Sequence, residues 1–199
     1  MNIAKWRDIV QRFAGRGVYP HELAFLLESP LRHLILSPQK LANTLHLTAD
    51  AHVLEIGPGP GYFSSEVARR IPGGQLVLFD IQPEMLNKSR IKLQRAGLKN
   101  LAVEGNAVFL PFGPRVFDVV FLVTVLGEIT QPGECLGCIG RILRPGGVLS
   151  LTEMRGDPDA LSASDLIRLA EPRGFQFLEQ HSFFGGFTLN LRKVEGTVG

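Results

Sequence analysis

The residues with the clearest chemical potential lie in one short segment, Glu55–Gly61, which reads Glu-Ile-Gly-Pro-Gly-Pro-Gly. Glycine has no Cβ, so glycines at alternate positions let the backbone bend tightly and come close to a bound molecule. A helix beginning just after the turn would direct its unpaired N–H groups and positive dipole end at that molecule. Glu55 adds a carboxylate two residues before the first glycine. The segment predicts a site for a small polar ligand.

The spacing of these glycines separates the possible ligands. It is G-x-G-x-G, whereas dinucleotide-binding turns use G-x-G-x-x-G, which argues against a nicotinamide oxidoreductase. Asp80 lies at the expected end of the next strand, where a carboxylate can accept hydrogen bonds from both hydroxyls of a ribose. Two plainer interpretations stay open: Glu55 could pair with a local N–H, and Asp80 could cap the helix that starts near Pro83.

The elements that must position these residues alternate along the chain from residue 52. Strands alternating with helices are typical of βαβ units, which form a parallel sheet covered on both faces. The chain ends differently, because two β-like runs joined by Gly185-Gly186 predict an antiparallel hairpin. We expect strands at 52–56, 75–80, 100–104, 117–123 and 146–153, helices at 61–71, 83–96, 132–142 and 163–172, and hairpin strands at 175–184 and 187–193.

Residues 1–48 are predicted to form a helical cap or lid on a main domain of residues 49–199. Trp6 and Phe13 fall on one face of an expected first helix. Ser37-Pro38 has the form of a helix start, with Ser37 as N-cap and Pro38 in the first turn. The alternative for the first helix is a membrane-surface role, in which Trp6 and Phe13 would face a lipid.

Composition excludes several other classes of function. The formal net charge is +2 without a block of like charges, which disfavours nucleic-acid and membrane partners. No long apolar run or signal-peptide pattern is present, so a cytoplasmic protein is expected. Cys135 and Cys138 fall within a helical pattern and the histidines are scattered, which predicts no metal site. No pattern indicates an oligomeric state.

Several motifs in order resemble the class I S-adenosylmethionine-dependent methyltransferases. They are the turn Val53–Gly61, the acidic strand end Phe79-Asp80-Ile81, the turn Glu104–Ala107, the strand start Phe117–Val120 and the turn Leu143–Leu149. The resemblance implies an α/β, Rossmann-like doubly wound sheet of order 3-2-1-4-5-7-6 with strand 7 antiparallel. It also implies S-adenosyl-L-methionine as cofactor, with S-adenosyl-L-homocysteine as product.

The resemblance assigns a cofactor role to residues of each motif. Glu55 would receive the ammonium group, Asp80 the ribose hydroxyls, and Ile81 and Met85 the adenine. Asn106 departs from the family, which commonly has Asp here, but an amide oxygen can still accept from the adenine amino group, and the Ala107 N–H can donate to the ring. The expected cofactor-binding residues are Glu55, Gly57, Pro58, Gly59, Gly61, Phe63, Asp80, Ile81, Met85, Asn106, Ala107 and Val123.

The acceptor is expected to be a small molecule methylated by in-line displacement. The glycine motif is also similar to that of ribosomal RNA adenine dimethylases, but Leu122–Glu128 replaces their polar-aromatic segment after strand four, which disfavours an RNA base. A non-catalytic cofactor-binding protein is the other alternative. Glu128 is a candidate general base or a helix-start carboxylate. The expected substrate-facing residues are Tyr19, His21, Thr124, Glu128, Glu153 and Arg155.

Overall fold

The computed structural model describes residues 36–195, which form a seven-stranded sheet of order β3-β2-β1-β4-β5-β7-β6. The expected first helices, with Tyr19 and His21, lie outside the described residues. Strand β7 runs antiparallel to both β5 and β6, and the remaining neighbours are parallel, so the predicted sheet order and terminal hairpin are confirmed. The strands are β1 His52–Ile56, β2 Gln75–Asp80, β3 Leu101–Glu104, β4 Phe117–Val123, β5 Leu143–Met154, β6 Phe175–Phe183 and β7 Gly186–Lys193.

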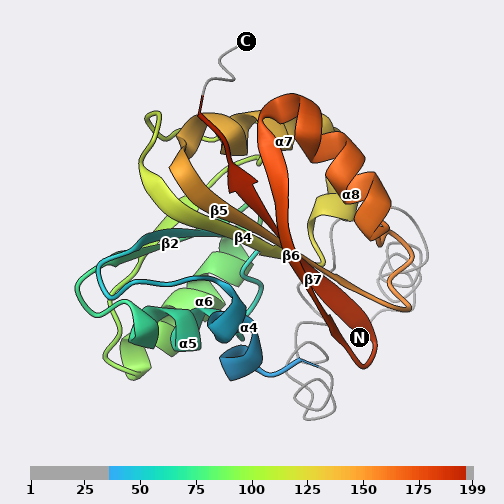
Figure 1. Ribbon diagram of the computed structural model, residues 1–199. Coiled ribbons are helices and arrows are strands. Elements are labelled where there is room, and N and C mark those ends of the chain that lie inside the picture. The colour runs from blue at the N-terminus through green and yellow to red at the C-terminus, as the bar shows by residue number, and fades with distance from the viewer. Residues whose placement is uncertain (1–35, 196–199) are drawn as a thin grey trace.

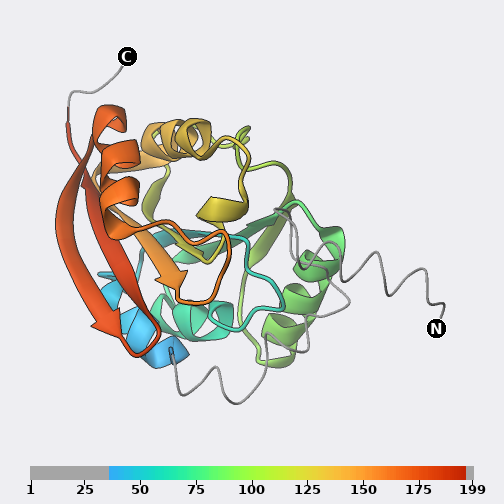
Figure 2. The ribbon, with the colours of Figure 1, turned by 90° about the vertical axis from the view of Figure 1, so that its right-hand side faces the viewer.

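Helices cover both faces of the sheet (Figures 1 and 2). Helices α4, α5 and α6 pack on one face, and α7 and α8 pack on the other. Two short 3-10 turns, η2 and η3, flank α7 and α8. The bounds are α4 Pro38–Thr44, α5 Ser64–Arg70, α6 Pro83–Arg95, η2 Leu126–Glu128, α7 Pro132–Ile142, α8 Ala163–Ala170 and η3 Glu171–Arg173. Within residues 36–195, no helix is both long and apolar enough to cross a membrane.

The central strands are apolar on both faces because both faces are covered. In β4, Val119 and Phe121 point into the core beneath α4–α6, whereas Val120 and Leu122 point into the core beneath α7 and α8. This alternation follows from the period of two in a strand. It fixes the register of β4 between β1 and β5, because a slip of one residue would exchange the two faces.

Three of the differences between the element boundaries and the sequence expectation have a clear structural cause. Helix α5 begins at Ser64 because the glycine-containing turn extends to Phe63. Strand β5 begins at Leu143, since that residue already pairs with Phe117 before the register shifts. Gly186 belongs to β7 and not to the hairpin turn, and a Cβ on it would lie 2.3 Å from the Glu153 carbonyl oxygen.

Two other local predictions, for the start of α4 and for the two cysteines, hold. Ser37 caps α4 by accepting a hydrogen bond from the Lys40 N–H at 3.2 Å. Cys135 is buried and Cys138 is half-buried on α7, as a helical pattern requires. No set of three metal-ligating side chains is arranged to hold an ion within the described range.

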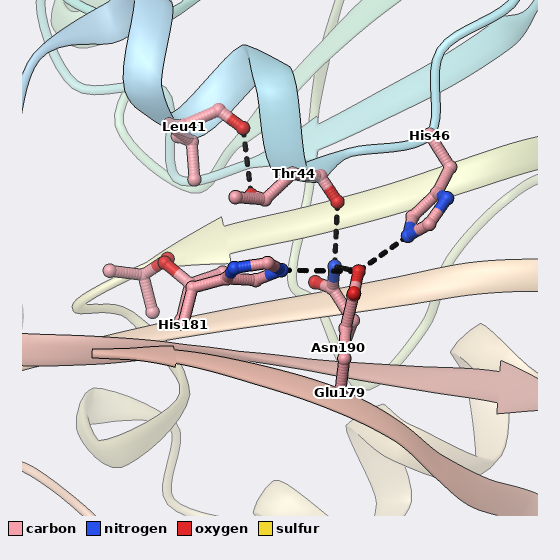
Figure 3. Close-up of polar contacts among 8 residues, drawn as sticks. Leu41, Thr44, His46, Glu179, His181 and Asn190 are labelled. Atoms are coloured by element: carbon pink, nitrogen blue, oxygen red, sulfur yellow. Dashed lines mark hydrogen bonds and ion pairs between the residues drawn. The ribbon is translucent and has the colours of Figure 1, made fainter.

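A polar cluster ties the end of α4 to the terminal hairpin (Figure 3). The Glu179 carboxylate oxygen Oε1 lies 2.5 Å from His46 Nε2 and 3.2 Å from His181 Nε2. It also accepts from Asn190 Nδ2 at 3.0 Å, and the same amide donates to the Thr44 carbonyl oxygen at 2.6 Å. These contacts, led by His46, lower the pKa of Glu179 to about 2. The cluster therefore joins α4, which belongs to the expected cap segment, to the last two strands.

We predict that Glu179→Gln lowers the free energy of unfolding by about 1 kcal/mol at pH 6, because the amide keeps the shape of the carboxylate but loses its charge-assisted hydrogen bonds. The pKa of Glu179 is depressed in the folded protein, so its contribution is present above about pH 4.5 and is lost as the pH falls towards 2. Urea unfolding at pH 6 and pH 3 measures both effects. Glu104→Gln, on the opposite edge strand, is the matched control. If the difference in free energy of unfolding between E179Q and wild type is as large at pH 3 as at pH 6, the role of the charge is contradicted.

Candidate active site

A pocket of about 250 Å³ opens where β1, β2 and β4 end. Ile56, Asp80 and Val123, the last residues of these three strands, all contribute to its lining. The chain leaves β1 and β4 toward opposite sides of the sheet, and the crevice at such a switch point is where open α/β sheets bind ligands. The sheet topology thus places the glycine-containing turn, the end of β2 and the loop after β4 around one cavity.

The turn after β1 depends on glycine at its first position. Gly57 has φ +70°, and its N–H donates to the Phe79 carbonyl oxygen at 2.8 Å. A Cβ on Gly57 would lie 2.4 Å from Val125 Cγ2, a side chain that lines the same pocket. A Cβ here would require the Val125 side chain or one of the two segments to move.

Gly61 has a different surrounding from Gly57, although it has φ +80° as well. It does not line the pocket, and a Cβ on it would lie 3.0 Å from Ser89 Cα and Cβ on helix α6. Gly61 therefore allows close packing between the turn and α6.

Glu55 is a buried carboxylate at the pocket wall. Its side chain is 2 % exposed, and its Oε2 atom has no hydrogen-bond partner. Burial, with a smaller effect of the nearby Asp80 charge, raises the pKa of Glu55 to about 8. A buried acceptor without a donor is costly, and a ligand that supplies a cationic donor would remove this cost.

Asp80 ends β2 and faces the glycine-containing turn. Its Oδ1 accepts from the Gln82 N–H at 2.9 Å, and the N–H groups of Gly59 and Ile81 also lie near the carboxylate. Burial nonetheless raises its pKa above the ordinary value. Helix α6 has Gln82 at its N-cap, so Asp80 is not the residue that begins the helix.

The turn after β3 forms a further wall of the pocket. Gly105, Asn106, Ala107 and Val108 all line it. The Asn106 Oδ1 atom accepts from the Val108 N–H at 3.1 Å, so part of its acceptor capacity is used within the turn. Asn106 thus makes a local turn contact and still borders the cavity.

The loop after β4 forms the remaining wall. Thr124 has φ +53°, an unusual conformation for a β-branched residue, and its N–H donates to the Thr152 carbonyl oxygen at 2.8 Å. Backbone strain of this kind is concentrated at functional sites. Glu128, half-buried on η2, also lines the pocket. The geometry thus brings Thr124 and Glu128 together beside the glycine-containing turn.

The structure places the other expected residues as follows. Eleven of the twelve expected cofactor-binding residues line the pocket, and Gly61 does not. Glu153 and Arg155 do not line it either, and Arg155 is exposed. The lining residues that were not predicted have no signal other than that they adjoin the recognised motifs: Ile56, Pro60, Tyr62, Phe79, Gln82, Gly105, Val108, Ile129, Thr130 and Gln131.

The sheet order, the antiparallel β7 and a pocket formed by an acidic strand end, a glycine-containing turn and a second acid define a class I S-adenosylmethionine-dependent methyltransferase. S-adenosyl-L-methionine is the cofactor of this class, and the unpartnered Glu55 oxygen suits its ammonium group. The sequence comparison agrees, since the family model described as a methyltransferase domain matches residues 47–177. The chain belongs to the methyltransferase-domain family.

Two curated relatives illustrate the sequence similarity. A ubiquinone/menaquinone biosynthesis C-methyltransferase UbiE from Pasteurella multocida is 35% identical over 104 residues, which are 51% of this chain and 39% of the relative. A demethylmenaquinone methyltransferase from Thermus thermophilus is 31% identical over 110 residues, which are 55% of this chain and 50% of the relative. The matched segment spans half or less of each of these relatives.

Solved structures support the fold. A SAM-dependent methyltransferase from Aquifex aeolicus has a TM-score of 0.83 at 19% identity, with 89% of this chain and 100% of that chain covered. The [4+2]-cyclase SpnF has a TM-score of 0.72 at 19% identity, with 80% of each chain covered. At this level of identity the similarity concerns the fold, and fold alone does not fix the reaction.

We predict that Gly57→Ala destabilises the protein more than Gly97→Ala. Both glycines have similar positive φ values, +70° and +68°, but a Cβ on Gly97 meets nothing within 4 Å. Both changes pay about 1 to 2 kcal/mol for a left-handed alanine, and only G57A adds the contact with Val125. Chemical denaturation measures the difference. Adding Val125→Ala to G57A should recover part of it, and equal losses in G57A and G97A would contradict the close approach of the two segments.

Proposed function

We propose that the chain transfers the methyl group of S-adenosylmethionine to a small apolar acceptor by in-line displacement. The observation that carries the proposal is the pair of buried acids, Glu55 and Asp80, on either side of a turn that only glycine permits. When bound, the cofactor supplies an already activated methyl group on a sulfonium centre. The protein then has to hold the donor, align the acceptor and exclude water.

Glu55 is proposed to hold the ammonium group of the donor. Its unpartnered Oε2 needs a hydrogen-bond donor, and a cationic donor would also favour the ionised acid. Asp80 is proposed to accept from the ribose hydroxyls, since a carboxylate has several acceptor positions and the Gln82 N–H occupies one of them. Gly57, Pro58 and Gly59 would leave room between the two acids.

The adenine is proposed to lie between the ends of β2 and β3. Ile81 and Met85 border the pocket on the β2 side, and Asn106 and Ala107 border it on the β3 side. Ile81 is 50 % exposed although it is apolar, so a bound ring would cover an otherwise exposed side chain. The Asn106 oxygen already accepts from Val108, so we propose that its second lone pair serves the adenine amino group.

The acceptor is proposed to lie beside the loop after β4. This wall combines the apolar side chains Val125 and Ile129 with one carboxylate, Glu128, which suits an apolar ring carrying an acidic hydroxyl. The quinone-related names of the curated relatives agree with this chemistry. Glu128 is proposed as the group that orients the acceptor or takes its proton.

Residues 1–48 are proposed to contribute a cap over this end of the pocket, with Tyr19 and His21 facing the acceptor. The cap would exclude water from the reacting atoms, which methyl transfer requires. The second candidate function is a cofactor-binding protein without methyl transfer. The fold similarity to a [4+2]-cyclase supports this second candidate, because that protein has the same architecture and is named for a reaction other than methyl transfer.

We predict that the affinity for S-adenosylmethionine rises between pH 6 and about 7.5. In the ligand-free protein Glu55 has a pKa of about 8 and holds a proton at pH 6. It must lose this proton to pair with an ammonium group. Affinity should therefore rise by up to tenfold per pH unit, and it should fall above about pH 8, where the amino group of the ligand loses its own proton. Calorimetric titration measures the affinity and the released proton.

Glu55→Gln provides the test of this linkage. The variant should bind at least about tenfold more weakly at pH 7.5, since a charge-assisted hydrogen bond contributes more than a neutral one. It should also release no proton at pH 6.5. Glu104→Gln, outside the pocket, controls for the substitution. Proton release from E55Q equal to that of wild type would exclude Glu55 as the partner of the ammonium group.

We predict methyl transfer to a naphthoquinol probe that lacks a ring methyl group, measured with radiolabelled S-adenosylmethionine. If Glu128 takes the acceptor proton, Glu128→Gln should reduce kcat by about a hundredfold or more with little effect on donor affinity. Unchanged kcat in E128Q would exclude the base role. Donor binding by wild type without transfer to this probe or to a panel of phenolic and quinol acceptors would favour the non-catalytic alternative.

A further inference from the structure

Glu153 occupies the end of β5, beside the wall of the pocket that we assign to the acceptor. Its neighbour Thr152 pairs with Val123 and accepts from the Thr124 N–H, and both of these partners line the pocket. By strand alternation Glu153 shares the sheet face of Leu149 and Leu151, the face covered by α7 and α8. An acid on this apolar face, next to the strained residue at the end of β4, requires an explanation.

The Glu153 side chain is buried and incompletely hydrogen-bonded. It is 3 % exposed, and its Oε1 atom has no hydrogen-bond partner. The backbone N–H of Leu161 donates to the carboxyl group, and its cross-strand neighbour on β7 is the apolar Phe187. Glu153 is therefore attached to the loop between β5 and α8, and it does not face the cavity itself.

The charges that act on Glu153 within the described residues are both negative. Asp157 comes from the loop between β5 and α8, and Glu128 comes from η2. Burial is the main cause that raises the pKa of Glu153 to about 8, and the two neighbouring acids raise it further, while the Leu161 N–H opposes the shift. At neutral pH the favoured form is the uncharged acid.

The same loop also packs tightly on the turn that carries Glu128. A Cβ on Gly127 would lie 1.9 Å from the Asp159 carbonyl oxygen, so the two backbones are in direct contact. Asp157 shapes the loop, because its Oδ1 accepts from the Asp159 N–H at 3.0 Å. The position of Glu128 therefore depends on a segment that Glu153 holds through Leu161.

We propose that Glu153 is a positioning residue for the acceptor end of the pocket. As an uncharged acid it fixes the loop of residues 155–161 against η2, and its ionisation separates these two segments through repulsion from Glu128 and Asp157. This proposal rests on the proposed function in one respect only, namely that this end of the pocket receives the acceptor. The packing of the two segments can be tested without any acceptor or donor.

Hydrogen–deuterium exchange of the wild-type full chain between pH 5.5 and 8.5 tests the proposal. The folded pKa of Glu153 is raised, so its stabilisation is present below the ordinary value of 4.5 and is lost as the pH rises through about 8. After correction for intrinsic exchange rates, protection of peptides covering residues 155–162 and 124–131 should fall by at least about tenfold from pH 5.5 to 7.5, and it should level off above about pH 8.

Glu153→Gln is the decisive variant, since glutamine keeps an acceptor for the Leu161 N–H and cannot ionise. Protection of both peptides should depend on pH markedly less in E153Q than in wild type, whereas a merely structural role of Glu153 would leave the wild-type dependence in place. Asp157→Asn is the second variant. It removes one negative neighbour and so lowers the pKa of Glu153, and protection should therefore level off at a lower pH than in wild type. This variant provides the test if E153Q does not fold.

Two outcomes would overturn the proposal. One is wild-type protection that stays constant from pH 5.5 to 8.5, and the other is the same pH dependence in wild type and E153Q. Calorimetric titration of wild type with S-adenosylmethionine reports on the proposed function separately. Loss of that binding with a normal exchange profile would contradict the proposed function and leave the role of Glu153 in the packing intact.

Discussion

The contact between the turn after β1 and the loop after β4 is the constraint on which the rest of the site depends. Gly57 approaches Val125 so closely that a Cβ would lie 2.4 Å from Val125 Cγ2, and this approach brings the glycine-containing turn beside the loop after β4. The parallel order of β2, β1 and β4 makes the contact possible, because it ends all three strands at one edge. Glu55 and Asp80 are then buried where only a polar ligand can satisfy them fully.

Much of the fold was predictable because local patterns and sheet topology agree. The strand bounds 52–56, 75–80 and 117–123 match the structure, since apolar runs bounded by turn residues are clear signals of buried parallel strands. Most of the lining residues from the turn after β1 and the end of β2 followed from the glycine motif and the acid at the end of β2. The start of β5 at Leu143 was missed, because it depends on pairing with Phe117 and not on local sequence.

The side of the pocket beside the loop after β4 was less predictable because its geometry arises from contacts between distant segments. Glu153 lies near the end of β5 and Arg155 directly follows the strand, at the same end of the sheet as the pocket, yet neither residue lines it. Gly61 belongs to the glycine motif and was therefore expected to contact the ligand, but it packs on Ser89 of α6. The left-handed conformation of Thr124 has no sequence signal at all. The wall formed by the glycine-containing turn and the end of β2 is therefore encoded locally, whereas the wall after β4 is formed by tertiary packing.

The most direct test of the central claim is calorimetric titration of the wild-type protein and of Asp80→Ala with S-adenosylmethionine, with NAD as the competing cofactor class. Wild type should bind S-adenosylmethionine and not NAD, and D80A should lose at least about tenfold in affinity, because two hydrogen bonds to a charged acceptor are removed. Absence of S-adenosylmethionine binding by wild type, or equal affinity in D80A, would contradict the assignment of this pocket to the methyl donor.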